Sequence, residues 1–109
     1  MAMSRRERGL SLAAIKLLSL MLEDPTADHY GLDLSKRAGV LTGTVYPLLK
    51  RLEDLGWLES RLEEIDAVSE GRPARRLYRL TGEGARQARA EIETLQSTLP
   101  WARPAGGLA

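Results

Sequence analysis

The segment from Leu41 to Trp57 constrains the fold more than any other part of the sequence. Its apolar residues recur at the spacing of an amphipathic helix, with Val45 at the centre of the buried stripe. The neighbours of Val45 on that stripe are Leu48, Leu49, Leu52 and Leu55. The opposite side carries Gly43, Tyr46, Pro47, Lys50 and Asp54. A helix face with a glycine, an aromatic ring and a lysine is suited to lie against a polar partner.

The composition favours a single, mainly helical domain. The chain has 109 residues and 43% of them are hydrophobic, which suffices for one packed core. Leucine and alanine dominate the apolar residues, whereas phenylalanine is absent, and this favours helices. The absence of cysteine excludes disulfides, thiol nucleophiles and zinc fingers. We find no signal peptide and no apolar run that could span a bilayer, so we expect a cytoplasmic protein with no membrane partner.

The formal net charge of +1 conceals a segregated charge distribution. Residues 71–90 hold six arginines against one glutamate, a net charge of +5. Residues 59–70 hold five acidic residues against one arginine, a net charge of −4. A basic strip therefore follows an acidic segment, and the strip is a candidate for contact with an anionic partner.

The first half of the chain predicts a helix followed by a helix-turn-helix. A flexible polar arm over residues 1–9 should precede a helix from about Ser11 to Glu23, which Asp24-Pro25 ends. A second helix should run from a cap at Thr26 to Ala38, with Gly39 able to take positive φ after it. The third helix, Thr42–Leu55, should be capped by Thr42. Pro47 costs a helical hydrogen bond unless it lies in the first turn, which suggests that this helix starts late.

The second half predicts a hairpin and a last helix. Residues 57–63 and 75–80 show a weak alternation of apolar and polar residues, which predicts two short strands joined by a polar loop. Arg79 is expected to pair with an acid such as Glu59 across these strands. The last helix opens at Thr81-Gly-Glu-Gly84 and should end before Pro100, leaving a flexible tail over residues 100–109.

The last helix carries a heptad seam of about two repeats. Because two heptads are too few for an independent coiled coil, a dimer would need the first helix as well. The seam could also fold back on its own domain. The predicted dimer interface consists of Leu12, Ile15, Ala85, Ala88, Ile92, Leu95 and Leu99.

The order helix, helix-turn-helix, hairpin and helix is that of a winged helix, and the residues resemble a known family. The segment 41–53, Leu-Thr-Gly-Thr-Val-Tyr-Pro-Leu-Leu-Lys-Arg-Leu-Glu, is similar to the recognition helix of PadR-like transcriptional regulators. The segment 71–84, Gly-Arg-Pro-Ala-Arg-Arg-Leu-Tyr-Arg-Leu-Thr-Gly-Glu-Gly, resembles the wing of that family. The segment 29–34, His-Tyr-Gly-Leu-Asp-Leu, resembles the entry to its second helix.

The resemblance covers about residues 10–95 and implies a homodimeric bacterial regulator that binds a two-fold symmetric operator. It implies that residues 42–55 enter the major groove and that the Gly71-Arg-Pro73 tip of the wing reaches the flanking DNA. The tail resembles the short-tailed branch of the family, in which one C-terminal helix pairs two protomers. We therefore expect a winged-helix domain over residues 10–82 and a dimerisation helix over residues 83–99. Leu77 replaces a position that is often aromatic in the family, and the acidic residues in the wing loop argue against contacts with phosphate beyond the three arginines.

The candidate DNA contacts combine the exposed side of the third helix with nearby cations. Small residues at a helix start allow close approach, and hydroxyls and lysine can reach base edges or phosphates. The candidates are Lys36, Thr42, Gly43, Thr44, Tyr46, Pro47, Lys50, Arg72, Arg75 and Arg76. The alternative for the helix is an ordinary solvated face with Tyr46 packed sideways on the second helix. The alternative for the arginines is a charged hairpin edge that prevents strand pairing.

The sequence predicts a transcriptional regulator, acting as a repressor, without a catalytic step, a metal or another cofactor. His29 is the only histidine and lacks a cysteine partner, so it is interpreted as a structural or a surface residue and not as a metal ligand. Trp101 could line a pocket for a small-molecule effector of unknown identity between two subunits, although such a tryptophan more often covers the edge of a core. The rival function is a winged-helix protein–protein interaction module without DNA binding. A basic rim around the third helix would favour DNA, and an apolar rim would favour a protein.

Overall fold

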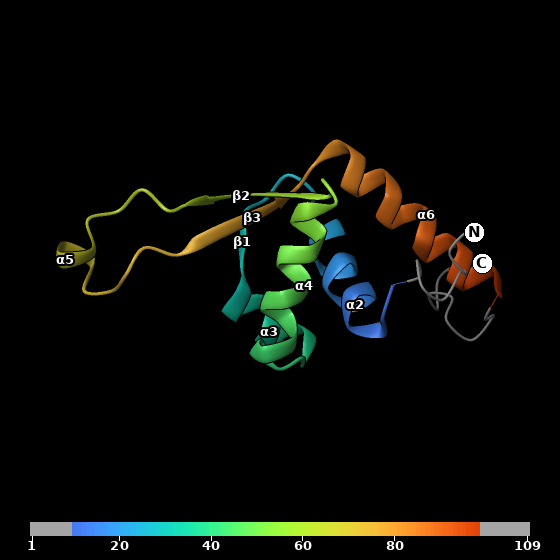
Figure 1. Cartoon of the computed structure of the whole chain (residues 1–109), viewed down its shortest axis with the longest axis horizontal. Helices are drawn as coiled ribbons and strands as arrows, with labels where there is room; N and C mark the ends of the chain where they lie inside the picture. Colours follow the sequence, from blue (N-terminus) through green and yellow to red (C-terminus); the bar gives the residue numbers. More distant parts are fainter. Residues whose placement is uncertain (1–9, 99–109) are drawn as a thin grey trace.

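The computed structural model describes residues 10–98, and these form a three-helix bundle, a small sheet and a long last helix (Figure 1). The bundle lies at the centre, two strands extend from it as an arm, and the last helix leaves on the other side (Figure 1). The predicted class, mainly helical with a small sheet, is confirmed. The elements are α2 (Leu12–Leu22), β1 (His29–Tyr30), α3 (Gly31–Ala38), α4 (Thr42–Asp54), β2 (Leu58–Leu62), α5 (Ala67–Glu70), β3 (Arg76–Leu80) and α6 (Gly82–Thr98).

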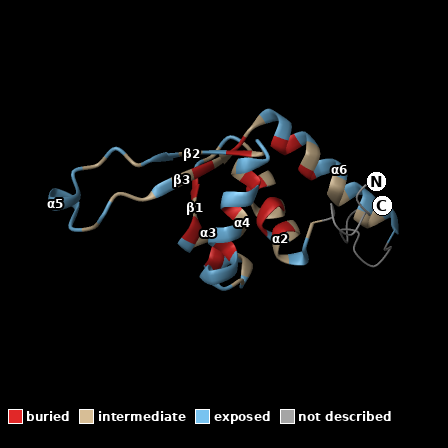
Figure 2. Ribbon diagram, in the orientation of Figure 1, coloured by how far each residue is buried: buried red, intermediate tan, exposed pale blue. Residues whose placement is uncertain are grey.

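The core lies where α2, α3 and α4 meet the base of the sheet. Figure 2 shows the buried residues on the facing sides of these helices, whereas the far end of the arm is exposed. The three helices supply the largest fully buried side chains, which are Leu17, Leu18, Met21, Leu34, Val45, Leu49 and Leu52. The predicted stripe centred on Val45 is therefore the side of α4 that packs in the core.

Local sequence sets the ends of α2 and α3. The Ser11 hydroxyl accepts a hydrogen bond from the amide of Ala14 at 3.1 Å, so α2 begins where it was predicted. The prediction that α3 begins at Thr26 is wrong, because the chain first forms β1 and α3 starts at Gly31. Gly39 ends α3 in the left-handed conformation with φ of 67°, as expected of a residue without a Cβ atom.

The start of α4 differs from the prediction in two ways. Leu41, not Thr42, is the N-cap residue, and its side chain makes no capping bond. The helix also does not start late at Pro47, which lies inside it as the sixth residue. Proline has no amide hydrogen, so the carbonyl of Gly43 lacks its helical donor. Both residues lie on the exposed side, where that carbonyl can bond to water instead.

The sheet has three antiparallel strands in the order β1-β3-β2, one more than the predicted hairpin. β1 pairs with β3 through His29 and Tyr78, and β2 pairs with β3 so that Glu59 lies opposite Arg79. The loop over residues 63–75 contains the single helical turn α5, which the sequence did not predict. We call β2, β3 and this loop the wing.

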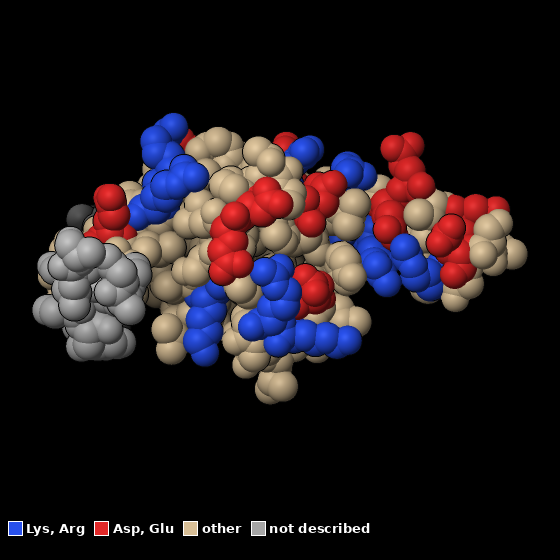
Figure 3. Space-filling model, turned by 180° about the vertical axis from the view of Figure 1, so that it is seen from behind, with Lys and Arg blue, Asp and Glu red and all other residues tan. Residues whose placement is uncertain are grey.

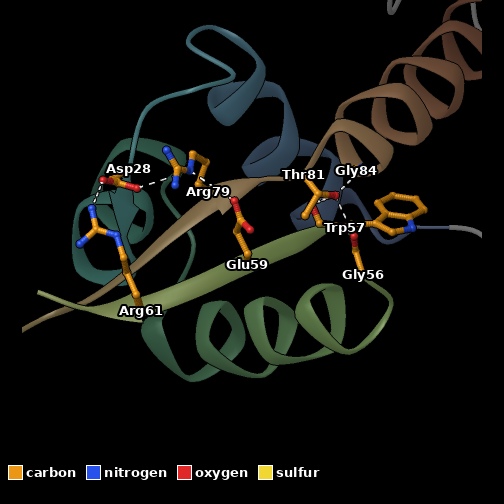
Figure 4. A network of polar contacts seen from close by, with 8 residues as sticks. All are labelled: Asp28, Gly56, Trp57, Glu59, Arg61, Arg79, Thr81 and Gly84. Atoms are coloured by element: carbon orange, nitrogen blue, oxygen red, sulfur yellow. Dashed lines mark hydrogen bonds and ion pairs between the residues drawn. The ribbon is translucent and has the colours of Figure 1, made fainter.

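The last helix is joined tightly to the base of the wing. The Thr81 hydroxyl accepts a hydrogen bond from the amide of Gly84 at 2.9 Å and donates one to the carbonyl of Gly56 at 2.7 Å (Figure 4). A Cβ atom at Gly84 would lie 1.9 Å from the carbonyl oxygen of Trp57, so only glycine fits there.

Two residues of the predicted dimer seam belong to the chain's own core. Ala85 and Ala88 are buried in the single chain, where α6 packs against α2 and β3. Ala85 is 9% exposed and Ala88 is fully buried, so both pack mainly within the chain itself, which was the alternative for the seam. Ile92 and Leu95, further along α6, are only partly buried. Leu99 and Trp101 lie outside the described residues, as do the predicted arm and tail.

Candidate nucleic-acid interface

The exposed side of α4 carries the residues that the sequence assigned to it. Because the buried residues of the helix recur every three or four positions, the residues between them face outward. The predicted contact residues exposed on this side are Thr42, Gly43, Thr44, Tyr46, Pro47 and Lys50. Lys36 is also exposed, in the last turn of α3.

Gly43 leaves a gap in the first turn of α4 that the chain itself does not fill. A Cβ atom added there would meet no atom within 4 Å. Its φ is not positive, so the backbone does not require glycine either. Glycine in a helix costs up to ~1 kcal/mol relative to alanine. Packing within the described chain does not explain this residue, whereas close approach of a partner would.

Tyr46 packs on α3 and is also exposed. A Cβ atom on Gly31 would lie 2.4 Å from Cε1 of the Tyr46 ring, so the ring rests directly on the glycine. The side chain nevertheless remains 46% exposed. The two alternatives for Tyr46, sideways packing and an exposed face, therefore both hold. Gly31 fixes where the ring lies, and the remaining surface of the ring faces outward.

Two cations of α4 differ in their surroundings. Lys50 forms an ion pair with Asp54 at 3.0 Å, and this bond raises the pKa of the lysine. Arg51 is exposed and has no carboxylate within 4 Å among residues 10–98. The sequence interpretation missed Arg51, although its position seven residues after Thr44 places both on one side of the helix. Arg51 is the cation of this helix whose charge is not offset.

Arg72 holds the wing loop together. Its guanidinium donates to both carboxylate oxygens of Glu63, at 2.7 and 3.1 Å, and the same carboxylate accepts the backbone amide of Arg75 at 3.2 Å. These bonds, led by that from Arg72, lower the pKa of Glu63 to about 2. The predicted contact of Arg72 with phosphate therefore competes with a bidentate ion pair inside the wing.

The other two wing arginines lie close to the helices. The Arg75 guanidinium stands 4.4 Å from the centre of the Tyr30 ring, a cation–π contact. Arg76 donates to the Ser60 hydroxyl at 3.2 Å, and that hydroxyl donates to the carboxylate of Glu53 on α4 at 2.6 Å. These contacts tie the base of the wing to β1 and α4.

A groove of about 290 Å³ lies between the helices and the base of the wing. Its walls are residues 30–32 at the start of α3, Tyr46 of α4, and residues 74–76 of the wing. The fold thus brings three of the predicted contact residues, Tyr46, Arg75 and Arg76, to one place. Lys36 and Arg72 do not line this groove. We call it the basal groove.

The face of the sheet that carries Arg61 and Arg79 has its cations paired with carboxylates. Arg61 pairs with Asp28 at 2.6 Å, and Arg79 lies 3.5 Å from Glu59 and 3.9 Å from Asp28 (Figure 4). The predicted pair of Arg79 and Glu59 is confirmed. Seen from behind, basic and acidic side chains are intermixed, and acidic ones gather at the tip of the wing (Figure 3).

The sequence model of the transcriptional regulator PadR-like family matches residues 17–90. The chain belongs to the PadR-like family. Members of this family are transcriptional regulators and not enzymes. No curated protein matches the sequence. In the described part of the chain, no helix is long and apolar enough to cross a membrane.

Solved structures share the winged-helix fold of this PadR-like protein. The PadR family transcriptional regulator from Eggerthella lenta DSM 2243 is 32% identical, with a TM-score of 0.59 over 81% of this chain and 78% of that chain. The protein smu.1704 from Streptococcus mutans UA159 is 25% identical, with a TM-score of 0.62 over 83% of each chain. Reduced AbfR, solved bound to DNA, is 23% identical, with a TM-score of 0.68 over 89% of this chain. The PadR-like chain spans 64% of the length of that AbfR chain.

Proposed function

We propose that this PadR-like protein is a homodimeric repressor that binds a two-fold symmetric DNA operator. In this proposal α4 enters the major groove and the base of the wing contacts the adjacent backbone. The observation that carries it is the exposed side of α4, which lies beside a groove lined by Tyr46, Arg75 and Arg76. A helix of 13 residues with small side chains in its first turn suits the width of the major groove.

Two features of α4 support DNA as its partner. The gap at Gly43 lets the backbone of the first turn approach another surface closely. The amide groups at the start of the helix attract phosphates through the helix dipole. Reduced AbfR, a protein of the same fold, was solved bound to DNA.

The proposed dimer uses the outer part of α6 together with α2. Leu12 of α2 is 68% exposed, which is unusual for a leucine in the helix that forms the centre of the core. Ile15, Ile92 and Leu95 are only partly buried, and α2 and α6 contact each other. A second copy laid along these helices would cover all four residues. The proposed boundary between the winged-helix domain and the dimerisation helix, at residues 82–83, falls in the first turn of α6.

The rival function is a protein-docking module, and the residues on the rim around the exposed side of α4 discriminate it from DNA binding. That rim carries Lys36, Lys50 and Arg51, although Leu41 is 81% exposed beside them. Asp54 offsets Lys50, whereas Lys36 and Arg51 form no ion pair in the described chain, and these two cations support DNA over an apolar protein surface. We therefore keep protein docking as an outcome of the test.

The test begins with selection of bound fragments from random and genomic DNA by the full chain. We expect fragments with two inverted half-sites about one helical turn apart, and sedimentation equilibrium should show a dimer. The variant Tyr46→Ala should lower operator affinity about 5- to 150-fold, the equivalent of ~1–3 kcal/mol. Circular dichroism should show that the variant remains folded.

The matched control removes another exposed apolar side chain far from α4. Val68 at the tip of the wing is 90% exposed, so Val68→Ala should leave affinity unchanged. If the wild-type chain selects no DNA, or if Tyr46→Ala binds as tightly as the wild type, then α4 does not read DNA. Repression is tested by placing the selected operator before a reporter gene. Reporter expression that does not fall when the protein is supplied would contradict a repressor.

A further inference from the structure

We propose that the basal groove binds one phosphodiester of the DNA backbone, with Arg75 as the ligand and Tyr30 as its positioning residue. This proposal rests on the proposed function and deepens it. It places the anchoring contact of the wing at its base and not at its tip. Four observations carry the proposal, and they concern charge, orientation, shape and the chemistry of the wing tip.

The first observation is that the two cations of the groove form no ion pair in the described chain. Among residues 10–98, most cations close to the sheet and in the wing have a carboxylate partner, including Arg61, Arg72 and Arg79. Arg75 and Arg76 have no carboxylate within 4 Å of their guanidinium groups in the described chain, and no acidic residue lines the groove. Two cations that form no ion pair attract an anion into the concave site that they share.

The second observation is that the Arg75 guanidinium is oriented. Its Cζ atom stands over the Tyr30 ring, 4.4 Å from the ring centre. In the described chain the side-chain N–H groups of Arg75 form no ion pair and no hydrogen bond, so they can donate to two oxygens, as in the bidentate binding of phosphate. Tyr30 is itself held by strand pairing with Leu77, so the ring is a fixed support. Fixing the cation before binding reduces the entropy that complex formation costs.

The third observation is the shape of the groove and its mixed walls. Its volume of about 290 Å³ leaves room for a phosphodiester together with its sugar. Arg75 and Arg76 form the cationic wall, and Leu32 and Ala74 supply apolar surface that suits a deoxyribose. The Tyr46 ring, at the boundary with α4, places the groove beside the helix proposed to enter the major groove.

The fourth observation is that the tip of the wing is unsuited to this role. Arg72 is engaged by Glu63 through two hydrogen bonds. Beyond it lie Glu64, Asp66 and Glu70, none of which has a cationic partner within 4 Å in the described chain. Three uncompensated carboxylates repel a phosphate backbone, so the wing can anchor to DNA only nearer its base.

The experiment measures operator affinity against salt concentration for the full chain and four variants. Arg75→Gln should weaken binding about ten-fold and reduce the slope of log K against log salt by about 0.9, the value for one phosphate contact. Arg89→Gln is the matched control, because Arg89 is exposed on α6 away from the groove. It should leave the slope unchanged.

Two variants of Tyr30 separate positioning from general packing. Tyr30→Phe keeps the ring and should retain the wild-type slope. Tyr30→Leu keeps an apolar side chain but removes the cation–π contact, so it should weaken binding several-fold and lower the slope. A purely structural role would change the affinity of Tyr30→Leu without changing its salt dependence, and this result would overturn the assignment of Tyr30.

A last arm identifies the phosphate. Neutral methylphosphonate linkages are placed at one position per half-site, one position at a time. At the position of the contacted phosphate, the loss of affinity caused by the neutral linkage and the loss caused by Arg75→Gln should not add, because both changes remove the same contact. If losses add at every position, or if Arg75→Gln leaves the salt slope unchanged, the groove is not a phosphate site even though Tyr46→Ala weakens binding. If the wild-type chain binds no DNA, the proposed function fails as well.

Discussion

Replacing Gly31 by alanine puts a methyl group where the Tyr46 ring lies. The new Cβ atom would stand 2.4 Å from Cε1, 2.8 Å from Cζ and 3.0 Å from the hydroxyl oxygen of Tyr46. Carbon atoms in contact prefer about 3.5–4.0 Å, so the overlap is about 1 Å. The backbone at Gly31 has an ordinary φ, so the close contact with the Tyr46 ring, and not backbone strain, opposes alanine there.

We expect that clash to reduce operator affinity more than it reduces the free energy of unfolding. Overpacking typically costs ~1–3 kcal/mol, and alanine regains at most ~1 kcal/mol of helix propensity at this position. Because Tyr46 is 46% exposed, its ring can swing outward and relieve the overlap. We therefore expect Gly31→Ala to lower the free energy of unfolding by ~1–2 kcal/mol and to reduce operator affinity as far as Tyr46→Ala does.

The assay is a double-mutant cycle on Gly31 and Tyr46. Urea unfolding gives the stability of the wild type, the two single variants and the double variant, and titration with operator DNA gives their affinities. The Tyr46→Ala background removes these three close contacts, so Gly31→Ala should become neutral or mildly stabilising. Gly43→Ala, whose Cβ atom meets nothing within 4 Å, is the control and should not destabilise the fold. An equal cost of Gly31→Ala in both backgrounds would refute the reasoning.

Two further predictions concern stability alone. Gly84→Ala should lower the free energy of unfolding by ~3 kcal/mol, because its Cβ atom would lie 1.9 Å from the backbone oxygen of Trp57. The control Gly82→Ala has open space and should change it by less than ~0.5 kcal/mol, and equal effects in thermal unfolding would contradict the fit at Gly84. The ion pair with Arg72 lowers the pKa of Glu63 from 4.5 to about 2, so its stabilising contribution is complete above pH 4.5 and is lost as pH falls toward 2. Glu63→Gln should therefore make the free energy of unfolding depend less on pH across that range, and urea titrations with the same pH slope for both proteins would exclude this role.

The sequence predicted the elements whose periodicity extends over several turns or strand pairs. The helices Leu12–Leu22 and Thr42–Asp54, and the strands Leu58–Leu62 and Arg76–Leu80, lie within a residue or two of their predicted bounds. The two-residue strand β1 is too short to show an alternation, and without it the start of α3 was placed too early at Thr26. Strand pairing with β3 overrode the local capping signal there.

The sequence predicted which residues belong to the candidate site better than it predicted their contacts. The helical period correctly placed Tyr46 and Lys50 on the exposed side of α4. The ion pairs that occupy Lys50 and Arg72 depend on which acids the fold brings near, and in the case of Arg72 the partner Glu63 is nine residues away along the chain. The heptad seam, likewise, could not separate Ala88, which packs in its own core, from Leu95, because both follow the same spacing.

Because the joint between the wing and α6 is short, a small change of angle there moves the far end of α6 by a larger distance. A single residue, Thr81, separates β3 from α6, and its hydroxyl bonds both to the turn at Gly56 and to the first turn of α6. The 17 residues of α6 span roughly 25 Å, so a tilt of about 5° at this joint displaces the far end by about 2 Å. In the proposed dimer, a small change in the angle of the two helices would move both of the surfaces proposed to contact DNA. The distance between the two proposed DNA-contacting surfaces would then depend on how rigidly the Thr81 hydroxyl and the close packing of Gly84 hold α6 at this joint.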